Sequence, residues 1–461
     1  MMRIRFLPLA LALALGAGSG LAHADDLIQI YGEARASDPQ LAGAEAVHLA
    51  TDENVDQARS ALLPQIGASL SYERSHGNSG GPQFVTNEDG TQSLINVVSS
   101  SRDYGRNLSG RLDQSILDLS KWTTLKSARA TAKAGNADYE AAQQDLMIRV
   151  ATAYFDVLTA EDALKFAQAN EQALNRQMEQ AQQRFEVGLS AITDVNDAKA
   201  QHDTAVANVI TAQNTLDDNR EALRQLTDKE PGNLKQLREQ LPMDKPNPED
   251  PEQWVAVAVE QSPILSSYAF QVDAANANIQ TARSAHLPTI GGQILYSKTP
   301  SWADNSASSF NDAFHTNSER WSTTYGLTLN VPIFAGGYTQ SRVRQSIYNR
   351  DAAQDQYELQ KRLIERSTRN GYRAVIAGAS QVEATRQAVI SAQSSLDATQ
   401  AGYEVGTRTI VDVLISQQQL LSAQSSYSQA RHAFVLNGLR LKQSAGIIEV
   451  KDLEAVNALL E

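Results

Sequence analysis

The residues whose types could form specific bonds lie in two stretches of nearly the same sequence. The first, "FEVGLSAITDVN", occupies residues 185–196, and the second, "YEVGTRTIVDVL", occupies residues 403–414. Each keeps an aspartate near its end, Asp194 or Asp412, and the second adds the phenol of Tyr403 and the guanidinium of Arg408. Such groups form hydrogen bonds and ion pairs, so their chemistry is that of holding parts of a protein together.

The remaining sequence offers little for catalysis. The chain has 461 residues, seven scattered histidines and no cysteine, and it contains no zinc-binding, nucleophile-elbow or phosphate-loop motif. The sequence therefore predicts neither an enzyme nor a protein with a metal or other cofactor. Without cysteine there is no disulfide framework and no lipidated N-terminal cysteine.

The first 24 residues predict a secretory signal peptide, 1–24. Arg3 and Arg5 precede an apolar stretch at 6–15, and Ala22-His23-Ala24 is typical of a cleavage site. The formal net charge of -13, which falls further without the two arginines, argues against nucleic acid as a partner. Beyond the leader no apolar run approaches the roughly 18 to 20 residues of a transmembrane helix, so any membrane crossing must use strands.

The chain is a tandem repeat. "ARSALLPQIGASLSY" at 58–72 returns as "ARSAHLPTIGGQILY" at 282–296, and each half has the order helix, strand, loop, strand, long helix, VG turn, helix. A segment rich in proline and charge joins the halves. We therefore predict repeat 1 at 25–227, a linker at 228–254 and repeat 2 at 255–461.

Four segments alternate apolar and polar residues as half-exposed strands do. They lie near 64–75, 104–116, 288–299 and 321–334. At about 3.3 Å per residue, roughly 12 residues tilted near 45° cover a bilayer core of about 30 Å. The segments between paired strands, 76–103 and 300–320, are rich in Gly, Ser, Asn and Asp, which predicts solvent loops.

A soluble β-sheet and a membrane barrel both explain this alternation. Aromatic side chains near the strand ends favour the barrel, because such residues form girdles at membrane interfaces. They are Tyr72, Tyr104, Tyr296, Trp302, Trp321 and Tyr325. Four strands cannot close a barrel, which takes about eight or more, so a barrel must be shared between chains.

Most of the other residues predict unusually long helices. Residues 119–187 and 338–405 contain no proline, and a helix of that length would extend about 100 Å. Apolar residues recur at heptad spacing, as in Leu146, Val150 and Val157, so we expect coiled-coil packing. Gly188 and Gly406 then lie at the turns between antiparallel helices, as the tips of two helical hairpins.

These features together resemble the TolC family of outer-membrane channel proteins. The motifs that carry the resemblance are "LPQIG" and "LPTIG", "VPIFAGG" at 331–337, "RFEVGLSAITDVNDAKAQHDTAVAN" at 184–208 and "AGYEVGTRTIVDVL" at 401–414. The resemblance implies an α+β fold in which a homotrimer shares a 12-stranded β-barrel that continues as a periplasmic α-helical tunnel.

The resemblance also implies residue roles. Tyr403 and Arg408 resemble gate residues that bond to the first hairpin, where the matching partners are Asp194, Thr193 and Gln177. Asp412 resembles the acidic residue of the pore constriction. The hairpin tips resemble the surface that binds a periplasmic adaptor protein, and they comprise Val187, Gly188, Leu189, Val405, Gly406 and Thr407.

One position departs from the family pattern. A second aspartate is expected one helical turn after Asp412, and this chain has Ile415 there. The resemblance then implies a ring of three carboxylates with weaker attraction for divalent cations than a doubled ring. In an alternative interpretation Asp197, the repeat equivalent of Ile415, supplies acidity from the first hairpin.

The implied function is that of a channel in the outer membrane of a Gram-negative bacterium. It would conduct drugs or secreted proteins from an inner-membrane transporter and a periplasmic adaptor to the exterior, through a gate that opens when the helical hairpins untwist. Expected partners are two further copies of the chain, the adaptor, the transporter and outer-membrane lipid. The alternative is a trimeric structural or adhesin-type stalk, for which duplicated VG hairpins have no use.

Overall fold

The computed structural model describes residues 25–243, 245–307 and 310–461. The predicted signal peptide lies outside the described residues. The helices are α1 (Leu27–Ser37), α2 (Pro39–Ser60), α3 (Leu119–Glu186), α4 (Ile192–Thr227), α5 (Pro251–Gln261), α6 (Pro263–Ser284), α7 (Tyr338–Glu404), α8 (Ile410–Ser444) and α9 (Val450–Asn457). The strands are β1 (Gln65–Thr86), β2 (Gln92–Leu117), β3 (Thr289–Ala307) and β4 (Phe310–Asn330).

The chain divides into two compact units, and each contains part of both repeats. One comprises the residues up to Ala42, Ala142–Glu260 and Glu365–Glu461, and we call it the hairpin unit. The other comprises Gly43–Ala141 and Gln261–Ile364, and we call it the strand unit. The compact units therefore group equivalent parts of the two repeats, and the predicted repeat boundaries stay a prediction.

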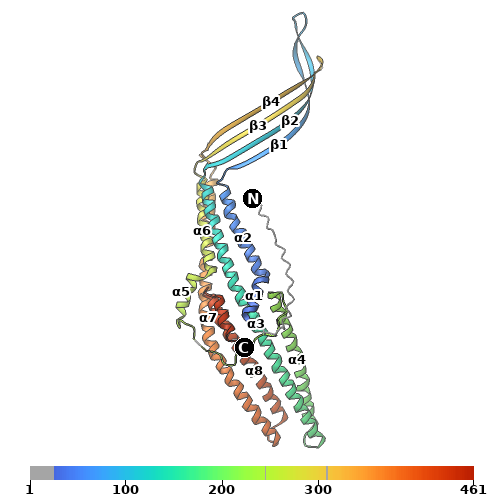
Figure 1. Cartoon of the computed structure of the whole chain (residues 1–461), viewed down its shortest axis with the longest axis vertical. Helices are drawn as coiled ribbons and strands as arrows, with labels where there is room; N and C mark the ends of the chain where they lie inside the picture. Colours follow the sequence, from blue (N-terminus) through green and yellow to red (C-terminus); the bar gives the residue numbers. More distant parts are fainter. Residues whose placement is uncertain (1–24, 244, 308–309) are drawn as a thin grey trace, which may run out of the picture. The chain divides into compact units, whose positions relative to one another are not determined.

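The strand unit carries one antiparallel sheet with the order β1-β2-β3-β4 (Figure 1). Pro64 and Pro288 each directly precede a strand, as expected of residues that end a helix and favour extended backbone. In β1, Ile66, Leu70 and Tyr72 point to one face, while Ser69 and Ser71 point to the other. The sheet thus has an apolar face and a polar face, as the alternation predicts.

The predicted solvent loops are wrong for most of their length. β1 and β2 stay paired as far as Thr86 and Gln92, and β3 and β4 stay paired to Ala307 and Phe310. Backbone hydrogen bonds do not require apolar alternation, so these Gly- and Ser-rich segments pair without giving a strand signal in the sequence. At the other end, β4 stops at Asn330, because Pro332 lacks the N–H that would continue the ladder.

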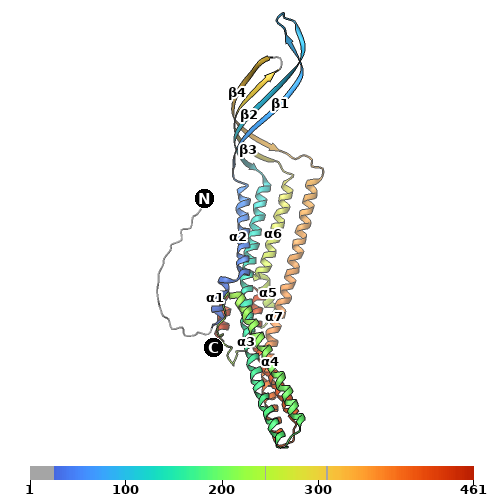
Figure 2. The same cartoon turned by 90° about the vertical axis from the view of Figure 1, so that its right-hand side faces the viewer.

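Helices of the strand unit pack closely where small residues allow it. A Cβ placed on Gly135 of α3 would lie 3.3 Å from the Thr51 Cβ of α2. The Thr281 hydroxyl of α6 donates to the Thr123 hydroxyl of α3 at 2.8 Å. These contacts bring α2, α3 and α6 side by side, as Figure 2 also shows. No helix of the described residues combines the length and the hydropathy that membrane crossing by a helix requires.

The hairpin unit contains two antiparallel helix pairs, the ends of α3 with α4 and of α7 with α8 (Figures 1 and 2). Its core includes the heptad residues Leu146, Val150 and Val157, which confirms coiled-coil-like burial along α3. The segment between α4 and α5 forms β-bridges that pair Leu234 with Asp25 and Leu237 with Leu460. These contacts lie at the end of the hairpin unit that is opposite the hairpin tips.

Candidate functional site

The two hairpin tips have the same backbone turn. Gly188 and Gly406 adopt φ values of 78° and 81°, which disfavour residues with a Cβ. Leu189 N–H donates to the Arg184 carbonyl at 2.7 Å, and Thr407 N–H donates to the Gly402 carbonyl at 2.8 Å. These bonds satisfy the last carbonyls of α3 and α7 in a Schellman motif, so the duplicated "VG" encodes the same helix end twice.

The helices that follow the turns begin differently. Thr409 caps α8, because its hydroxyl accepts from Asp412 N–H at 3.2 Å while the Asp412 carboxylate accepts from Thr409 N–H at 2.9 Å. At the matching position the N-cap residue of α4 is Ala191, whose side chain forms no capping hydrogen bond. Bonds from the Thr409 backbone and hydroxyl hold the pKa of the Asp412 carboxyl below its usual range. The Asp194 carboxylate makes no such bond within the described residues.

Tyr403 lies where the two hairpins meet. It is only 7% exposed, and its phenol oxygen has no hydrogen-bond partner among the described residues. It belongs to an apolar cluster with Leu174 and Ala205 of the first hairpin and Leu396, Ile410, Val413, Leu414 and Leu420 of the second. Burial raises the pKa of the Tyr403 phenol, the Arg184 guanidinium opposes this shift, and the Asp194 carboxylate adds to it.

Arg184 is a site residue that the sequence analysis missed. Its guanidinium carbon lies 5.1 Å from the centre of the Tyr403 ring, a cation–π contact between the hairpins. The repeat equivalent of Arg184 is Gly402, where a Cβ would lie 2.7 Å from the Arg408 Cγ. Next to each turn there is thus one arginine, before the turn in the first hairpin and after it in the second. Extending the repeat comparison by one residue would have shown this exchange.

The structure brings some predicted gate residues together and leaves others apart. The Asp194 carboxylate acts electrostatically on the Tyr403 phenol across the hairpins. Arg408 is exposed and acts electrostatically on Asp412 of its own hairpin, and within one copy it makes no bond to Asp194, Thr193 or Gln177 among the described residues. The predicted bonds across the hairpins therefore stay predictions. The Gln177 side-chain oxygen is buried without a partner in the described structure.

Asp197 and Ile415, which the sequence analysis linked through the repeat, line the same hollow of about 410 Å³. It lies between α4 and α8, and its other lining residues are Ala200, Gln201, Val411, Leu414, Gln418 and Gln419. The Asp197 carboxylate of the first hairpin therefore lies near Ile415 of the second, and its contribution to an acidic ring stays a prediction.

The predicted adaptor-contacting tips expose apolar side chains. Val187, Leu189 and Val405 are 70%, 69% and 75% exposed. Gly188, Gly406 and Thr407 complete the two tips, with all three exposed. Such apolar exposure at two adjacent turns is typical of a surface that a partner covers.

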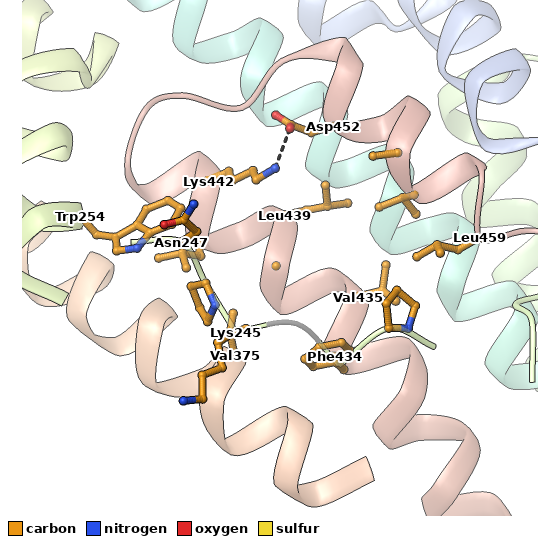
Figure 3. Close-up of a pocket in the computed structure, with 16 residues that line it drawn as sticks. Lys245, Asn247, Trp254, Val375, Phe434, Val435, Leu439, Lys442, Asp452 and Leu459 are labelled. Atoms are coloured by element: carbon orange, nitrogen blue, oxygen red, sulfur yellow. Dashed lines mark hydrogen bonds and ion pairs between the residues drawn. The ribbon is translucent and has the colours of Figure 1, made fainter. Parts of the chain in front are cut away.

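Another cavity, of about 480 Å³, lies away from the tips. The segment before α5, α5 itself, α7, α8 and α9 line it with mostly apolar side chains, and Figure 3 shows Trp254 and Phe434 among them. Lys442 Nζ pairs with the Asp452 carboxylate at 2.7 Å at its edge. It contains none of the predicted site residues. Within the described residues, no three His, Asp or Glu side chains converge as a metal ion would require.

A four-stranded sheet with an apolar face, joined to long helices that end in paired hairpin tips and arranged as a repeat, defines the class of outer-membrane channels with helical tunnels. The chain belongs to the outer membrane efflux protein family, which it matches over residues 30–228 and 254–447.

Named relatives agree with this assignment. The chain is 37% identical to the outer membrane protein TolC of Escherichia coli K12, covering 99% of this chain and 89% of the relative. It is 36% identical to TolC of Vibrio cholerae, with 99% of both covered. It is 28% identical to the alkaline protease secretion protein AprF of Pseudomonas aeruginosa, covering 95% of this chain and 88% of that protein.

Solved structures show the same fold. The Campylobacter jejuni CmeC outer membrane channel superposes with a TM-score of 0.74 at 18% identity, covering 99% of this chain and 98% of that one. These comparisons confirm the predicted resemblance and the α+β fold. They identify the protein as an outer-membrane channel of a Gram-negative bacterium, with its helical part in the periplasm, and do not favour the structural stalk. The relatives are named as transport proteins, not as enzymes.

Proposed function

We propose that three copies of the chain close one barrel of 12 strands and continue it as a helical tunnel for export. The two long unpaired edges of the sheet, β1 and β4, carry this proposal. In lipid, each unpaired backbone group on such an edge costs several kcal/mol, so the edges must pair with another strand. Four strands are too few to close on themselves, whereas β1 of one copy meeting β4 of the next closes a ring.

The mouth of this tunnel would be closed at rest by the hairpin tips. Among the described residues, the buried Tyr403 hydroxyl has no hydrogen-bond partner, and the exposed Arg408 guanidinium forms no ion pair with a first-hairpin carboxylate. With six hairpins around one axis, the Tyr403 and Arg408 side chains would bond to Asp194, Thr193 and Gln177 of the first hairpins. Each charge-assisted bond at such a partly desolvated contact contributes roughly 1.5 to 3 kcal/mol, repeated three times.

Opening requires a partner that binds the open arrangement better than the closed one. The exposed apolar tips, Val187, Leu189 and Val405, are the surface we assign to a periplasmic adaptor. An inner-membrane transporter would supply the cargo, either drugs or secreted proteins. AprF is named for protease secretion and BepC of Brucella suis, which is 26% identical over 86% of this chain and 79% of that protein, for efflux. Asp412 would line the constriction, and Asp197, which shares the hollow between α4 and α8 with Ile415, would lie near it.

Cysteine crosslinking tests the shared barrel directly, because the natural chain has no cysteine. One cysteine replaces Ser69 in β1, and a second is placed in turn at Ser322, Thr324 or Thr328 in β4. Within one sheet β1 and β4 lie three strand spacings apart, roughly 14 Å, which is too far for a disulfide. Oxidation in outer membranes should therefore give disulfide-linked trimers, which a reductant converts back to monomers.

A matched control places the cysteines at Ser69 and Ser109, whose hydroxyls lie 2.7 Å apart within one sheet. This pair should oxidise without raising the apparent mass. Monomeric product from every β1–β4 pair would contradict the shared barrel. Discrete conductance steps from the purified protein in planar bilayers test the channel itself.

A further inference from the structure

The apolar face of the sheet carries a cluster of rings and guanidinium groups about midway along β1 and β2 and in the second half of β3. We call this cluster the arginine–aromatic patch, and it consists of Tyr72 and Arg74 of β1, Tyr104 and Arg106 of β2, and Trp302 of β3. Register places all five on one face: Tyr72 pairs with Arg106, Arg74 with Tyr104, and Tyr104 with Trp302. This is also the face of Ile66 and Leu70.

The patch is a continuous stack. The rings of Tyr104 and Trp302 lie 5.7 Å apart and 9° from parallel. The Arg74 guanidinium covers the Tyr104 ring at 5.4 Å, and the Arg106 guanidinium covers the Trp302 ring at 5.3 Å. The Tyr72 ring completes it, 6.5 Å from Trp302. Packing against aromatic faces holds both guanidinium groups in place and leaves their N–H edges available.

Neither arginine has an anionic partner. Within the described residues no carboxylate lies at ion-pair distance from Arg74 or Arg106. The acidic residues on this face are already paired: Glu319 binds Lys298 Nζ at 2.5 Å, and Asp304 binds His315 Nδ1 at 2.6 Å. An exposed pair of positive charges with no counterion in the protein is complementary to an external anion.

The height of the patch fits a membrane interface. Along β3, Trp302 lies about 12 residues beyond Ile290, which is roughly 40 Å along the strand and 28 Å at a tilt near 45°. The apolar band of an outer-membrane barrel is about 25 Å tall. The opposite end has its own exposed aromatic residues, Trp122, Phe334 and Tyr338. With the helices in the periplasm, the patch therefore lies at the outward interface.

We propose that the arginine–aromatic patch binds the phosphate groups of an anionic glycolipid in the outward leaflet of the outer membrane. Two planar guanidinium groups match the paired oxygens of phosphate, and the rings below them contact the acyl chains. The proposal rests on the proposed barrel only in requiring that the apolar face contacts lipid. It adds a binding site for one class of lipid to a face that would otherwise contact membrane lipids without specificity.

The test uses the full-length channel reconstituted in nanodiscs with lipid A, which carries phosphate, or with phosphate-free lipid A. Native mass spectrometry after release from the discs counts the lipid that stays bound. Replacing both arginines (Arg74→Gln with Arg106→Gln) should weaken lipid A retention about tenfold or more. Arg320→Gln, on the polar face of β4, is the matched control and should retain lipid A like the natural chain.

Equal retention of phosphorylated and phosphate-free lipid A by the natural chain would overturn the proposal, and this comparison needs no variant. An equal loss in Arg320→Gln would also overturn it, as would displacement of lipid A by millimolar inorganic phosphate, which would indicate a free-anion site. Arg74→Lys with Arg106→Lys keeps the charge and should retain lipid partially. Conductance measured on the same preparations reports separately whether the barrel itself forms.

Discussion

The first and second hairpin tips share a turn and an aspartate, and they differ in the position of their arginines and in their helix caps. Both end a helix with a glycine at positive φ and the same pair of backbone bonds. The second restarts its helix with a capping box between Thr409 and Asp412, whereas the first restarts at Ala191 without one. A capped carboxylate is held against its own helix, and an uncapped one faces its surroundings.

This difference explains how two aspartates at the same repeat position have different surroundings. Asp412 bonds to its own helix end, and Asp194 lies close enough to influence Tyr403 across the hairpins. The arginines are exchanged as well, since Arg184 packs on Tyr403 while Arg408 needs the space left by Gly402. The two hairpins keep the same turn backbone, and side-chain differences give each hairpin its own contacts.

The largest expected effect comes from making the second hairpin resemble the first. Tyr403→Phe with Arg408→Ser removes the hydroxyl and the charge that the first hairpin lacks. If these groups bond to a first hairpin in the trimer, the closed state loses several charge-assisted bonds, and the resting conductance in planar bilayers should rise severalfold.

Tyr403→Phe alone separates gating from packing. In one copy the phenol oxygen is buried without a partner, so its removal there should be neutral or slightly stabilising. A raised resting conductance would show that assembly supplies the missing partner. Unchanged conductance in both the single and the double variant would contradict the assignment of Tyr403 and Arg408 to the gate.

A smaller effect is expected on ion selectivity. Asp412→Ala should lower the cation-to-anion permeability ratio of the open channel about twofold, because three negative charges leave the constriction. Asp197→Ala in the first hairpin measures whether the carboxylate beside Ile415 contributes to the same ring. If only Asp197→Ala changes the permeability ratio, the constriction lies on the first hairpin. If neither variant changes the ratio, neither aspartate lines the constriction.

Much of this architecture was predictable because the signals are periodic. Heptads and missing prolines predict α3 and α7 almost to the residue, and the VG turns predict both tips. The capping difference was also visible, since a Thr three residues before Asp412 is a capping signature and Ala191 is not.

Other features could not be predicted, because they depend on contacts between distant residues. The extended pairing of Gly80 with Val98 uses only backbone groups, which leave no pattern in side chains. The contact of Arg184 with Tyr403 exists only because two hairpins far apart in sequence pack together. The arginine–aromatic patch likewise needs the register of three strands.

The smallest expected effect comes from substitutions that exchange the helix caps of the two hairpins. Thr409→Ala removes the cap of α8 and should cost about 1 kcal/mol, which lowers the melting temperature by a few degrees. Ala191→Thr gives α4 the cap that it lacks and should raise stability by a similar amount. Thermal unfolding followed by far-ultraviolet circular dichroism measures both.

The pH dependence of the cap follows from the lowered pKa of Asp412. A carboxyl with a depressed folded-state pKa stabilises the protein above its unfolded pKa, near 4, and loses this contribution as the pH falls through the lower folded value. The difference in melting temperature between the natural chain and Thr409→Ala should therefore narrow from pH 7 to about pH 3. A constant difference would show that the Asp412 carboxylate adds nothing to the cap.

Ala191→Thr also tests why the two hairpins differ. A new cap would engage the Asp194 carboxylate as Thr409 engages Asp412, and so withdraw it from Tyr403. We then expect greater thermal stability together with a higher resting conductance, two changes that ordinary stabilisation does not combine. If stability rises and the channel stays closed, Asp194 is not the partner of Tyr403, and the missing cap has no role in the gate.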